Sequence, residues 1–447
     1  MPPPRKPKKP KEPEGITRIT VKGFKSLANE TSIDIRPLTI LAGANSSGKS
    51  SIMQPLLLLK QTLEAPYDPG GLKLDGPHVE ATGVHQVLSQ VGQADMPPLV
   101  VELEGGPGDS LCLAYAVDSR RGLTVYEVCV KEDGCTHCLR PDMTHSEIEA
   151  ALPDSASTLA RGVPQDGERR EWRAGGDRGF LRLRYAVPGH PATAVGTSVE
   201  FRLDLGVSDA LQRILHVPRL RGLQGRAYPQ TATGPLFPGT FEAYTGSLIL
   251  HWQGSDAERL DGVVRGLRLA ELADGVEARQ RDATSIEVFV PIRPARGPRA
   301  ETAMANIADV GSSVSHALPA IVALQAAEPG RLVYIEQPEI HLHPRAQVAL
   351  AQVLVEAANR GVRVVAETHS SLLLVAVQTL VAKQRIAKED LALHWFARNR
   401  QTGVTRVRTA RVTGTGSFGP WPEDFSDVEL RAHAAYLDAA HEQRKAG

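Results

Sequence analysis

Residues 43–50 combine two glycines, a lysine and a serine at a spacing that suits the binding of a polyphosphate. The segment fits the template of a glycine, four further residues and then Gly-Lys-Ser. Gly43 and Gly48 would let the backbone approach phosphate oxygens with no Cβ in the way. Lys49 would reach the β- and γ-phosphates, and the Ser50 hydroxyl would ligate Mg²⁺. The predicted nucleotide contacts of this phosphate loop and the residue after it are Gly43, Asn45, Ser46, Ser47, Gly48, Lys49, Ser50 and Ser51.

The segments on either side would position the phosphate loop. The apolar run from Leu38 to Ala42 predicts a buried strand, and the pattern from Ile52 to Leu63 predicts a helix. In a strand–loop–helix unit, the loop N–H groups and the positive end of the helix dipole face one polyphosphate. A chance match in a loop of glycine and serine is the alternative. The flanking elements, the lysine and the hydroxyl all favour a nucleoside triphosphate site.

A second candidate segment follows the apolar run Leu332–Ile335, which predicts another buried strand. The segment begins with Glu336, Gln337, Pro338 and Glu339. A carboxylate at the end of such a strand lies at the carboxyl edge of the sheet, where phosphates bind. We therefore predict Glu336 as a Mg²⁺ ligand, with an acidic turn exposed to solvent as the alternative.

Three further positions could contact the nucleotide. His369 follows a predicted buried strand and could donate to the γ-phosphate or orient the attacking water, although a histidine placed there is more often structural. Gly311, Ser312 and Ser313 precede a helical pattern, and the free N–H groups at a helix start can bind an anion. A helix cap without a ligand is the alternative reading of that segment. Lys25 could lie beside the base or the phosphates.

Composition limits the class of protein. The chain has 447 residues, enough for two or three compact units, and its 51 Lys and Arg residues balance 51 Asp and Glu residues. Net charge therefore gives no indication of a polyanionic partner. The sequence contains neither an apolar run long enough to span a membrane nor an apolar signal core, and its cysteines do not indicate a secreted disulfide framework. We expect a cytoplasmic protein that does not bind membranes.

Five segments together resemble one known family. They read ITVKGFKSL, GANSSGKSS, VGSSVSHALP, IEQPEIHLHPRAQ and ETHS. They are similar to motifs of the ABC-type ATPases, in the branch that contains SMC, RecF and overcoming-lysogenization-defect (OLD) proteins. The segment around Trp421 also resembles the Trp-Pro tail of some OLD-like ATPases, many of which occur in bacterial anti-phage defence. The implied fold is α/β: an ABC-type P-loop ATPase head, with a mixed sheet, flanking helices and an antiparallel β lobe, that carries a β-rich insertion.

The resemblance implies how a site would be assembled. Proteins of this family are similar in binding ATP and Mg²⁺ between two heads. The phosphate loop would hold ATP in one subunit, while Gly311, Ser312 and Ser313 would contact its γ-phosphate from the other. His369 would be the switch histidine. The implied metal ligands are Ser50 and Glu336, and the catalytic candidates are Glu336, Gln337, Glu339 and His369.

Two positions depart from the family pattern. The family often has a Mg²⁺-side acid followed by a catalytic glutamate, but the second position here is Gln337. A neutral amide cannot accept a proton from water, so this residue is excluded as a general base. Either Glu336 or Glu339 would then take over, or hydrolysis would be slow and ATP would act chiefly as a clamp on the dimer. His316 replaces the glutamine common at its signature position, which leaves that contact open.

Pattern and resemblance together divide the chain. Between about residues 65 and 300, short alternating runs replace the helical patterns, whereas strands separated by helices after residue 300 argue for a parallel sheet covered on both faces. The polar stretch 153–178 is predicted to be a mobile loop. The predicted units are a disordered basic tail (1–15), the N-terminal part of the ATPase head (16–100), a β-rich lobe and inserted module (101–300), the C-terminal part of the head (301–412), and a C-terminal tail with a helix (413–447).

Three clusters keep alternatives open. A small zinc knuckle could be formed by Cys129, Cys135, Cys138 and His145. Because a second Cys-x-x-Cys is missing, buried thiols in a hairpin are favoured. A patch for phosphate, for nucleic acid or for acidic residues could be formed by Arg213, Arg219, Arg221 and Arg226. A dimer contact, or less readily a metal site, could involve His341 and His343.

Four functions can be weighed. The favoured one is an OLD-like ATPase that forms a homodimer or a higher assembly around ATP. It would act as the sensor or scaffold subunit that controls a toxin or nuclease effector in anti-phage defence. The alternative is a RecF-like ATP-dependent clamp, for which DNA is a partner. A self-contained nuclease is disfavoured because too little chain follows His369 for a metal-binding Toprim domain. The missing heptads exclude a long-armed SMC protein, and the signature does not support a transporter motor.

Overall fold

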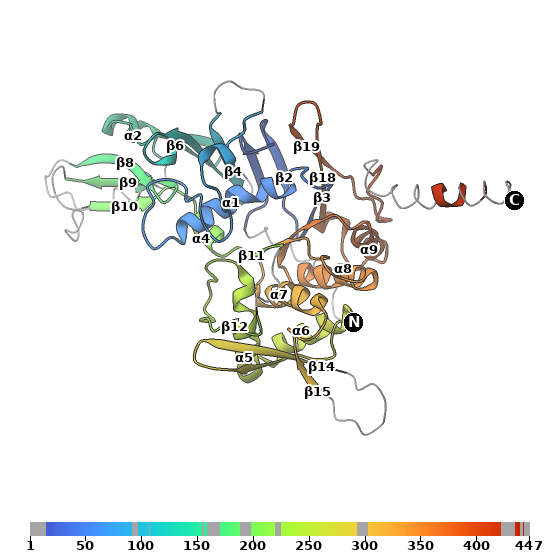
Figure 1. Ribbon diagram of the computed structural model, residues 1–447. Coiled ribbons are helices and arrows are strands. Elements are labelled where there is room, and N and C mark those ends of the chain that lie inside the picture. Colours follow the sequence, from blue (N-terminus) through green and yellow to red (C-terminus); the bar gives the residue numbers. More distant parts are fainter. Residues whose placement is uncertain are drawn as a thin grey trace, which may run out of the picture.

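The computed structural model describes residues 15–91, 97–106, 108–153, 156–158, 170–187, 198–219, 225–292, 303–421, 434–438 and 441. The predicted basic tail, apart from residue 15, and most of the predicted C-terminal tail lie outside these residues. Figure 1 shows a central sheet with its helices, an antiparallel sheet beside the helix α1 (Lys49–Leu63), and a third unit that contains the helix α5 (Thr245–Ser255). Among the described residues, no helix combines the length and the apolar character needed to cross a bilayer.

A six-stranded core sheet carries the phosphate loop. Its strand order is β11-β16-β17-β3-β18-β19; the first five strands run parallel, and β19 pairs antiparallel with β18. Every residue of β3 and of β17 is buried, which explains why their apolar runs show no alternation and confirms the predicted parallel sheet. The bounds are β11 Leu215–Val217, β16 Leu332–Glu336, β17 Arg363–Thr368, β3 Leu38–Gly43, β18 Leu391–Arg398 and β19 Thr405–Thr409.

Helices cover both faces of the core sheet. Successive side chains of a strand point to opposite faces, so alternate residues of β3 pack on different helices. Leu38 and Ile40 of β3 belong to the apolar core that includes α7, α8 and α9, whereas Leu41 belongs to the core that includes α1. The predicted helix 344–359 is confirmed at both ends. The bounds of these helices are α7 Ser312–Ala326, α8 Pro344–Asn359 and α9 Ser371–Ala382.

Two antiparallel sheets form the lobe beside α1. The larger has the order β2-β1-β4-β5-β6-β7, and the smaller has the order β10-β9-β8. The alternating runs 99–103, 111–117, 124–130 and 180–185 form strands, and the run 198–205 forms one as far as Arg202. The prediction of a mobile loop over residues 153–178 is wrong for residues 171–177, which form β8, because they pair with β9. Most of the rest of that stretch lies outside the described residues. The bounds are β1 Arg18–Lys22, β2 Thr31–Asp34, β4 Leu99–Glu104, β5 Ser110–Asp118, β6 Gly122–Glu132, β7 Cys135–Leu139, β8 Glu171–Asp177, β9 Phe180–Ala186 and β10 Ser198–Arg202.

The cysteines form a cross-strand bridge instead of a zinc knuckle. Cys129 of β6 and Cys138 of β7 are register partners and are joined by a disulfide. Cys135 is an exposed free thiol, and Nδ1 of His145 accepts a hydrogen bond from the Trp172 N–H at 2.9 Å. The zinc knuckle is therefore contradicted, because two of its four ligands bond each other. The hairpin is confirmed, whereas the prediction of buried thiols is wrong, because Cys129 and Cys138 are oxidised to a disulfide and Cys135 is exposed.

The region predicted to be β-rich, residues 101–300, also contains helices and a strand of the core sheet. Its edge strand β11 pairs with β16, and its helices α5 and α6 pack on α7. The sequence gives a weak helical signal because α5 contains Gly246 and Gly254, and glycine is a poor helix former. Tertiary packing nevertheless favours glycine in these helices. A Cβ on Gly266 of α6 would lie only 2.7 Å from the Ile321 side chain of α7, so a larger residue would prevent the close contact of the two helices. The remaining bounds are α2 His145–Ala151, α4 Val207–Gln212, α6 Ala257–Leu269, β12 Tyr228–Pro229, β13 Glu277–Gln280, β14 Ser285–Ile292 and β15 Ala303–Asn306.

Candidate nucleotide-binding site

The phosphate loop joins β3 to α1, as predicted, and its two glycines are required by packing as well as by a ligand. Gly43 has φ of 154°, and a Cβ there would lie 2.3 Å from the carbonyl oxygen of Phe396 in β18. Gly48 has φ of 97°, and a Cβ there would lie 2.5 Å from Oγ1 of Thr405. Both values of φ lie in the region that favours glycine. The neighbouring strand and hairpin therefore fix these two residues even without nucleotide.

Lys49 and His369 converge on one carbonyl group at the base of the loop. Nζ of Lys49 donates to the carbonyl oxygens of Gly43 at 2.9 Å and Ala44 at 2.8 Å, and Nδ1 of His369 donates to Gly43 at 2.8 Å. Burial lowers the pKa of Lys49 to about 8, against the raising effect of Glu367. Burial, followed by the Lys49 charge, lowers the pKa of His369. A triphosphate would reverse both shifts, because negative charge favours the protonated forms.

Glu367 is a site residue that sequence reasoning missed. Its carboxylate is buried at the end of β17, where Oε2 accepts a hydrogen bond from the Ser50 hydroxyl at 2.9 Å and Oε1 accepts one from Tyr334. Burial and then the neighbouring charge of Glu336 raise the pKa of Glu367 to about 7. The available signal was the one already used for Glu336, an acid at the end of an apolar strand. The predicted metal ligand Ser50 therefore meets Glu367.

Glu336 ends β16 beside Glu367, and the two residues are register partners. Its Oε1 accepts a hydrogen bond from Nε2 of His216 at 3.1 Å, and its Oε2 accepts one from the Arg219 N–H at 3.3 Å. Burial alone would raise the pKa of Glu336, but the hydrogen bond and charge of His216, together with Arg219, lower it overall. A hydroxyl and two adjacent carboxylates form a set of hard oxygen donors, which suits Mg²⁺.

A buried polar chain connects Glu336 to the far end of α1. Nδ1 of His216 lies 3.0 Å from Nδ1 of His78, and Nε2 of His78 lies 3.4 Å from Oε2 of Glu64. Glu64 in turn accepts a hydrogen bond from the fully buried Lys60 at 2.5 Å. Burial lowers the pKa of His78 to about 4, so its ring is neutral and its single N–H faces Glu64. Nε2 of His216 donates to Glu336, and its Nδ1 lies within hydrogen-bond distance of His78.

Gln337 and Glu339 have different positions relative to the nucleotide pocket. Gln337 has φ of 45°, donates its N–H to the carbonyl oxygen of Glu367 at 3.0 Å, and lines the pocket. Glu339 is buried and does not line it. Oε1 of Glu339 accepts hydrogen bonds from the Thr368 hydroxyl and the His369 N–H, both at 2.8 Å. Glu339 thus holds the backbone of the predicted switch histidine and lies behind it.

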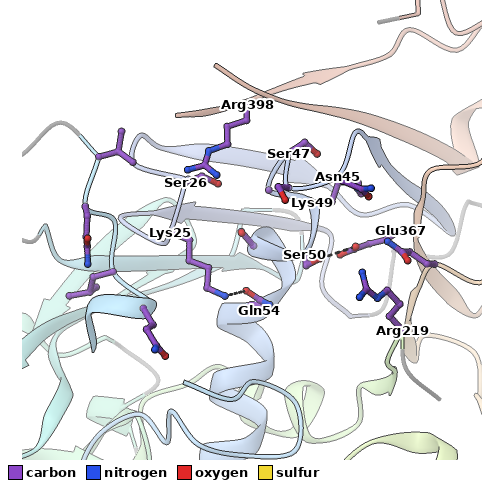
Figure 2. A pocket seen from close by; sticks show the side chains of 18 of the residues that line it. Lys25, Ser26, Asn45, Ser47, Lys49, Ser50, Gln54, Arg219, Glu367 and Arg398 are labelled. Atoms are coloured by element: carbon purple, nitrogen blue, oxygen red, sulfur yellow. Dashed lines mark hydrogen bonds between the residues drawn. The ribbon is translucent and has the colours of Figure 1, made fainter. Parts of the chain in front are cut away.

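The pocket above the phosphate loop has a volume of about 570 Å³. Gly43, Glu336 and Glu339, which were predicted as site residues, are not among its lining residues. Figure 2 shows Ser50 and Glu367 on one side of it and Lys25 and Gln54 on the other. Nζ of Lys25 donates to Oε1 of Gln54 at 2.6 Å. The predicted residues that line the pocket are Lys25, Asn45, Ser46, Ser47, Gly48, Lys49, Ser50, Ser51, Gln337 and His369. Lining residues that the site prediction did not include are Ser26, Gln54, His85, Gln86, Leu88, Gln90, Val91, Arg219, Glu367 and Arg398.

The predicted signature residues lie away from this pocket. Gly311 and Ser312 are exposed at the start of α7, and the Ser313 hydroxyl donates to the carbonyl oxygen of His341 at 2.7 Å. The rings of His316 and His341 lie 4.4 Å apart between centroids. The segment from 311 to 313 therefore packs on the loop after β16 and does not line the pocket of its own chain.

The four predicted arginines do not form one patch. The side chain of Arg213 pairs with Asp209 at 3.0 Å, and the side chain of Arg226 pairs with Asp309. Arg219 lines the nucleotide pocket, and Arg221 lies outside the described residues. Because two of these charges are already matched by acids of the chain, the alternative of an internal acidic partner is confirmed for them.

Two family models match parts of the chain. The model described as "AAA ATPase domain" matches residues 15–92, which include the phosphate loop. The model described as "AAA domain, putative AbiEii toxin, Type IV TA system" matches residues 244–376, which include α7, Glu336, Glu367 and His369. With the core sheet and the phosphate loop, these matches support a P-loop ATPase, and they name neither the ABC type nor the SMC/RecF branch. The prediction of a P-loop ATPase with an α/β fold is thereby confirmed.

Solved structures of SMC heads match over most of the chain at low identity and low TM-scores. The SMC head domain from Thermotoga maritima is 11% identical, with 89% of this chain and 100% of that chain covered at a TM-score of 0.36. An SMC head bound to the C-winged helix domain of ScpA is 13% identical, with 88% and 97% covered at 0.41. An SMC head with an extended coiled coil, bound to a ScpA domain from Pyrococcus furiosus, is 12% identical, with 88% and 96% covered at 0.40. TM-scores this low carry no argument about function. None of the curated proteins compared with the chain matches it.

Proposed function

We propose that this chain is an OLD-like ATPase subunit that binds ATP and Mg²⁺ between two copies of itself. In this proposal, the ATP-bound dimer is the sensor or scaffold that controls a toxin or nuclease effector in bacterial anti-phage defence. The proposal has three parts, which are the ATP site, the dimer and the effector, and each has its own support.

The ATP site is supported by one pocket that phosphate-loop residues and Glu367 line together. The loop N–H groups, the start of α1 and Lys49 would hold the phosphates. Ser50, with Glu367 and Glu336 beside it, would hold Mg²⁺. Once bound, the ion would neutralise charge on the terminal phosphate.

The observation that carries the dimer is the placement of the first turn of α7. Gly311 and Ser312 are exposed, yet residues 311–313 do not line the pocket of the same chain. N–H groups at a helix start are free to bind an anion. A second copy could bring them to the γ-phosphate, as the resemblance implies. Each ATP site would then be completed by both chains.

Slow hydrolysis follows from the groups nearest the expected terminal phosphate. The pocket position expected for a catalytic glutamate is occupied by Gln337, which cannot accept a proton. Glu339 is engaged behind His369, and Glu336 accepts hydrogen bonds from His216 and Arg219. We infer that bound ATP persists and acts chiefly as a clamp on the dimer.

The role in defence rests on two likenesses. The family model over residues 244–376 carries a toxin and Type IV toxin–antitoxin description, and the motif order resembles that of OLD-like ATPases. The RecF-like alternative gains no support from the arginines, because Arg213 and Arg226 are paired with acids of the same chain. We therefore keep the effector-controlling role as the proposed function.

Light scattering with and without ATP and Mg²⁺ tests the first two parts. We expect the mass of the wild-type protein to double with ATP and that of Lys49→Ala to stay unchanged, because this variant loses a ligand of the phosphates. Lys383→Ala, which removes an exposed lysine just past α9, is the matched control and should dimerise as the wild type does. A Lys49→Ala protein that dimerises normally with ATP would contradict the proposal. Co-purification with the products of neighbouring genes tests the third part.

A further inference from the structure

Arg219 is a cation that lines the nucleotide pocket, and the proposed function assigns it no role. It follows β11, the edge strand of the core sheet, after a single intervening residue, Pro218. Because β11 pairs in parallel with β16, the chain leaves the sheet at the same edge as Glu336. The region between the two family-model matches thus delivers an arginine to the site.

The backbone of Arg219 is fixed while its side chain is available. Its N–H donates to Oε2 of Glu336 at 3.3 Å, which holds its Cα beside the acid at the end of β16. The residue is exposed and lines the same pocket as Lys49, Ser50 and Glu367. Among the described residues, no carboxylate forms a salt bridge with its guanidinium group. Figure 2 shows it on the Ser50–Glu367 side of the pocket, away from Lys25 and Gln54.

The position of Arg219 in the pocket indicates which part of the nucleotide its side chain would contact. In the proposed site, the terminal phosphate and its cation would bind at the end of the pocket where Ser50 and Glu367 lie. Lys25 and Gln54 lie toward the opposite end. A γ-phosphate adds negative charge that ADP lacks at this end. The planar guanidinium fork donates two parallel hydrogen bonds to phosphate oxygens, and it stays charged at every physiological pH.

We propose that Arg219 binds the γ-phosphate of ATP held by its own chain, and so makes the site prefer ATP over ADP. This inference rests on the proposed ATP site and adds a specificity-determining residue to it. The arginine acts from the same chain as the phosphate loop, whereas Ser312 and Ser313 would act from the partner. During hydrolysis the same contact stabilises charge on the transferring phosphoryl group.

The test compares the binding of ADP with that of the β,γ-imido analogue of ATP, each with Mg²⁺, by equilibrium titration. For Arg219→Ala we expect affinity for the analogue to fall about tenfold to a hundredfold, with ADP affinity changed less than about twofold. Arg219→Lys should recover part of the loss, because it keeps the charge without the fork. The matched control is Arg213→Ala, whose side chain pairs with Asp209 and does not line the pocket.

The outcomes separate this inference from the proposed function. A wild-type protein that binds neither nucleotide would overturn both. A wild-type protein that binds both, combined with an Arg219→Ala variant that keeps the wild-type ratio of affinities, would overturn the inference alone. Equal losses for both nucleotides would overturn it as well, because the contact would then not be specific to the γ-phosphate.

Mixed dimers test whether the arginine serves its own chain. The two chains are joined by a flexible linker, so that the hybrid forms although Lys49→Ala alone is expected to stay monomeric. In such a hybrid of Arg219→Ala and Lys49→Ala chains, one site lacks the arginine and the other lacks the lysine if both residues act in the same chain. We then expect no ATP hydrolysis beyond the sum of the separate variants. Recovered hydrolysis would show that the Lys49→Ala chain lends its arginine across the interface, and would overturn the assignment to the same chain.

Discussion

Glu336 and Glu367 end adjacent parallel strands as register partners, so two carboxylates lie side by side where α1 begins. Their pKa values move apart. Burial and the charge of Glu336 raise the pKa of Glu367 to about 7, whereas hydrogen bonds from His216 and Arg219 outweigh burial and lower that of Glu336. One of the pair is therefore ionised at neutral pH before any cation binds. The pKa of the other is raised toward neutrality, and a cation bound beside it would favour its ionised form.

The raised pKa of Glu367 predicts a pH-dependent stability. A glutamate in an unfolded chain titrates near pH 4.3, so folding here favours the protonated form. The stabilising contribution is fully present below that pH and is lost as the pH rises through about 7. Between pH 4.5 and 8 we expect the wild type to lose about 2–3 kcal/mol relative to Glu367→Gln. Urea unfolding in EDTA, without nucleotide, measures this difference. Parallel curves for the two proteins would show that the carboxylate is ionised throughout.

Gln337→Glu should speed ATP hydrolysis. The new carboxylate would face the pocket that Gln337 lines and could accept a proton from water. General-base catalysis contributes about 10²–10⁴-fold, so we expect turnover to rise by at least about tenfold in a steady-state phosphate-release assay. Gln337→Ala is the control for side-chain removal and should give no such rise. Unchanged turnover in Gln337→Glu would place the base elsewhere.

His216→Ala should destabilise the protein strongly. The His216 ring is buried between His78 and Glu336, and each of these two residues would lose a hydrogen-bond partner. The same buried hydrogen-bond network continues through His78 to Glu64 and Lys60. Loss of hydrogen bonds to buried charged groups costs about 2–5 kcal/mol. Urea unfolding at pH 7 checks this value. His251→Ala, on an exposed position of α5, should change stability by less than about 0.5 kcal/mol. Equally small losses of stability in the two variants would mean that the hydrogen bonds of His216 with His78 and Glu336 contribute little to stability.

Gly48→Ala separates backbone strain from steric conflict. The substitution forces φ of 97° on alanine and places Cβ 2.5 Å from Oγ1 of Thr405, so we expect a loss of about 2–4 kcal/mol. Gly206→Ala has φ of 75° with open space around the new Cβ, and strain alone should cost about 1 kcal/mol. Thr405→Ala should restore part of the stability of Gly48→Ala. Thermal unfolding compares the variants, and equal losses at both glycines would show that the contact with Thr405 yields easily.

Local pattern was sufficient for the elements that carry the motifs. The helix 344–359, the strands β3 and β16, and the alternating strands β4, β5, β6 and β9 follow from periodicity, because each of them buries a face that its own side chains define. The strand β8 was not predicted, because it lies in the stretch expected to be a mobile loop. The helices α5 and α6 could not be found in this way. Their glycines argue against a helix locally, and only the packing of Gly266 against Ile321 makes the small residue favourable.

By itself, the sequence determined that a phosphate loop precedes a helix, and that Glu336, Gln337 and His369 follow buried strands. Spacing fixes such units within a few residues of chain. Only the tertiary structure decided which acid meets Ser50, because β17 lies between β16 and β3 and so brings Glu367 to the hydroxyl. It likewise decided that β11, distant in the chain, carries His216 and Arg219 to Glu336. Strand order in a sheet depends on long-range pairing, which residue spacing does not encode.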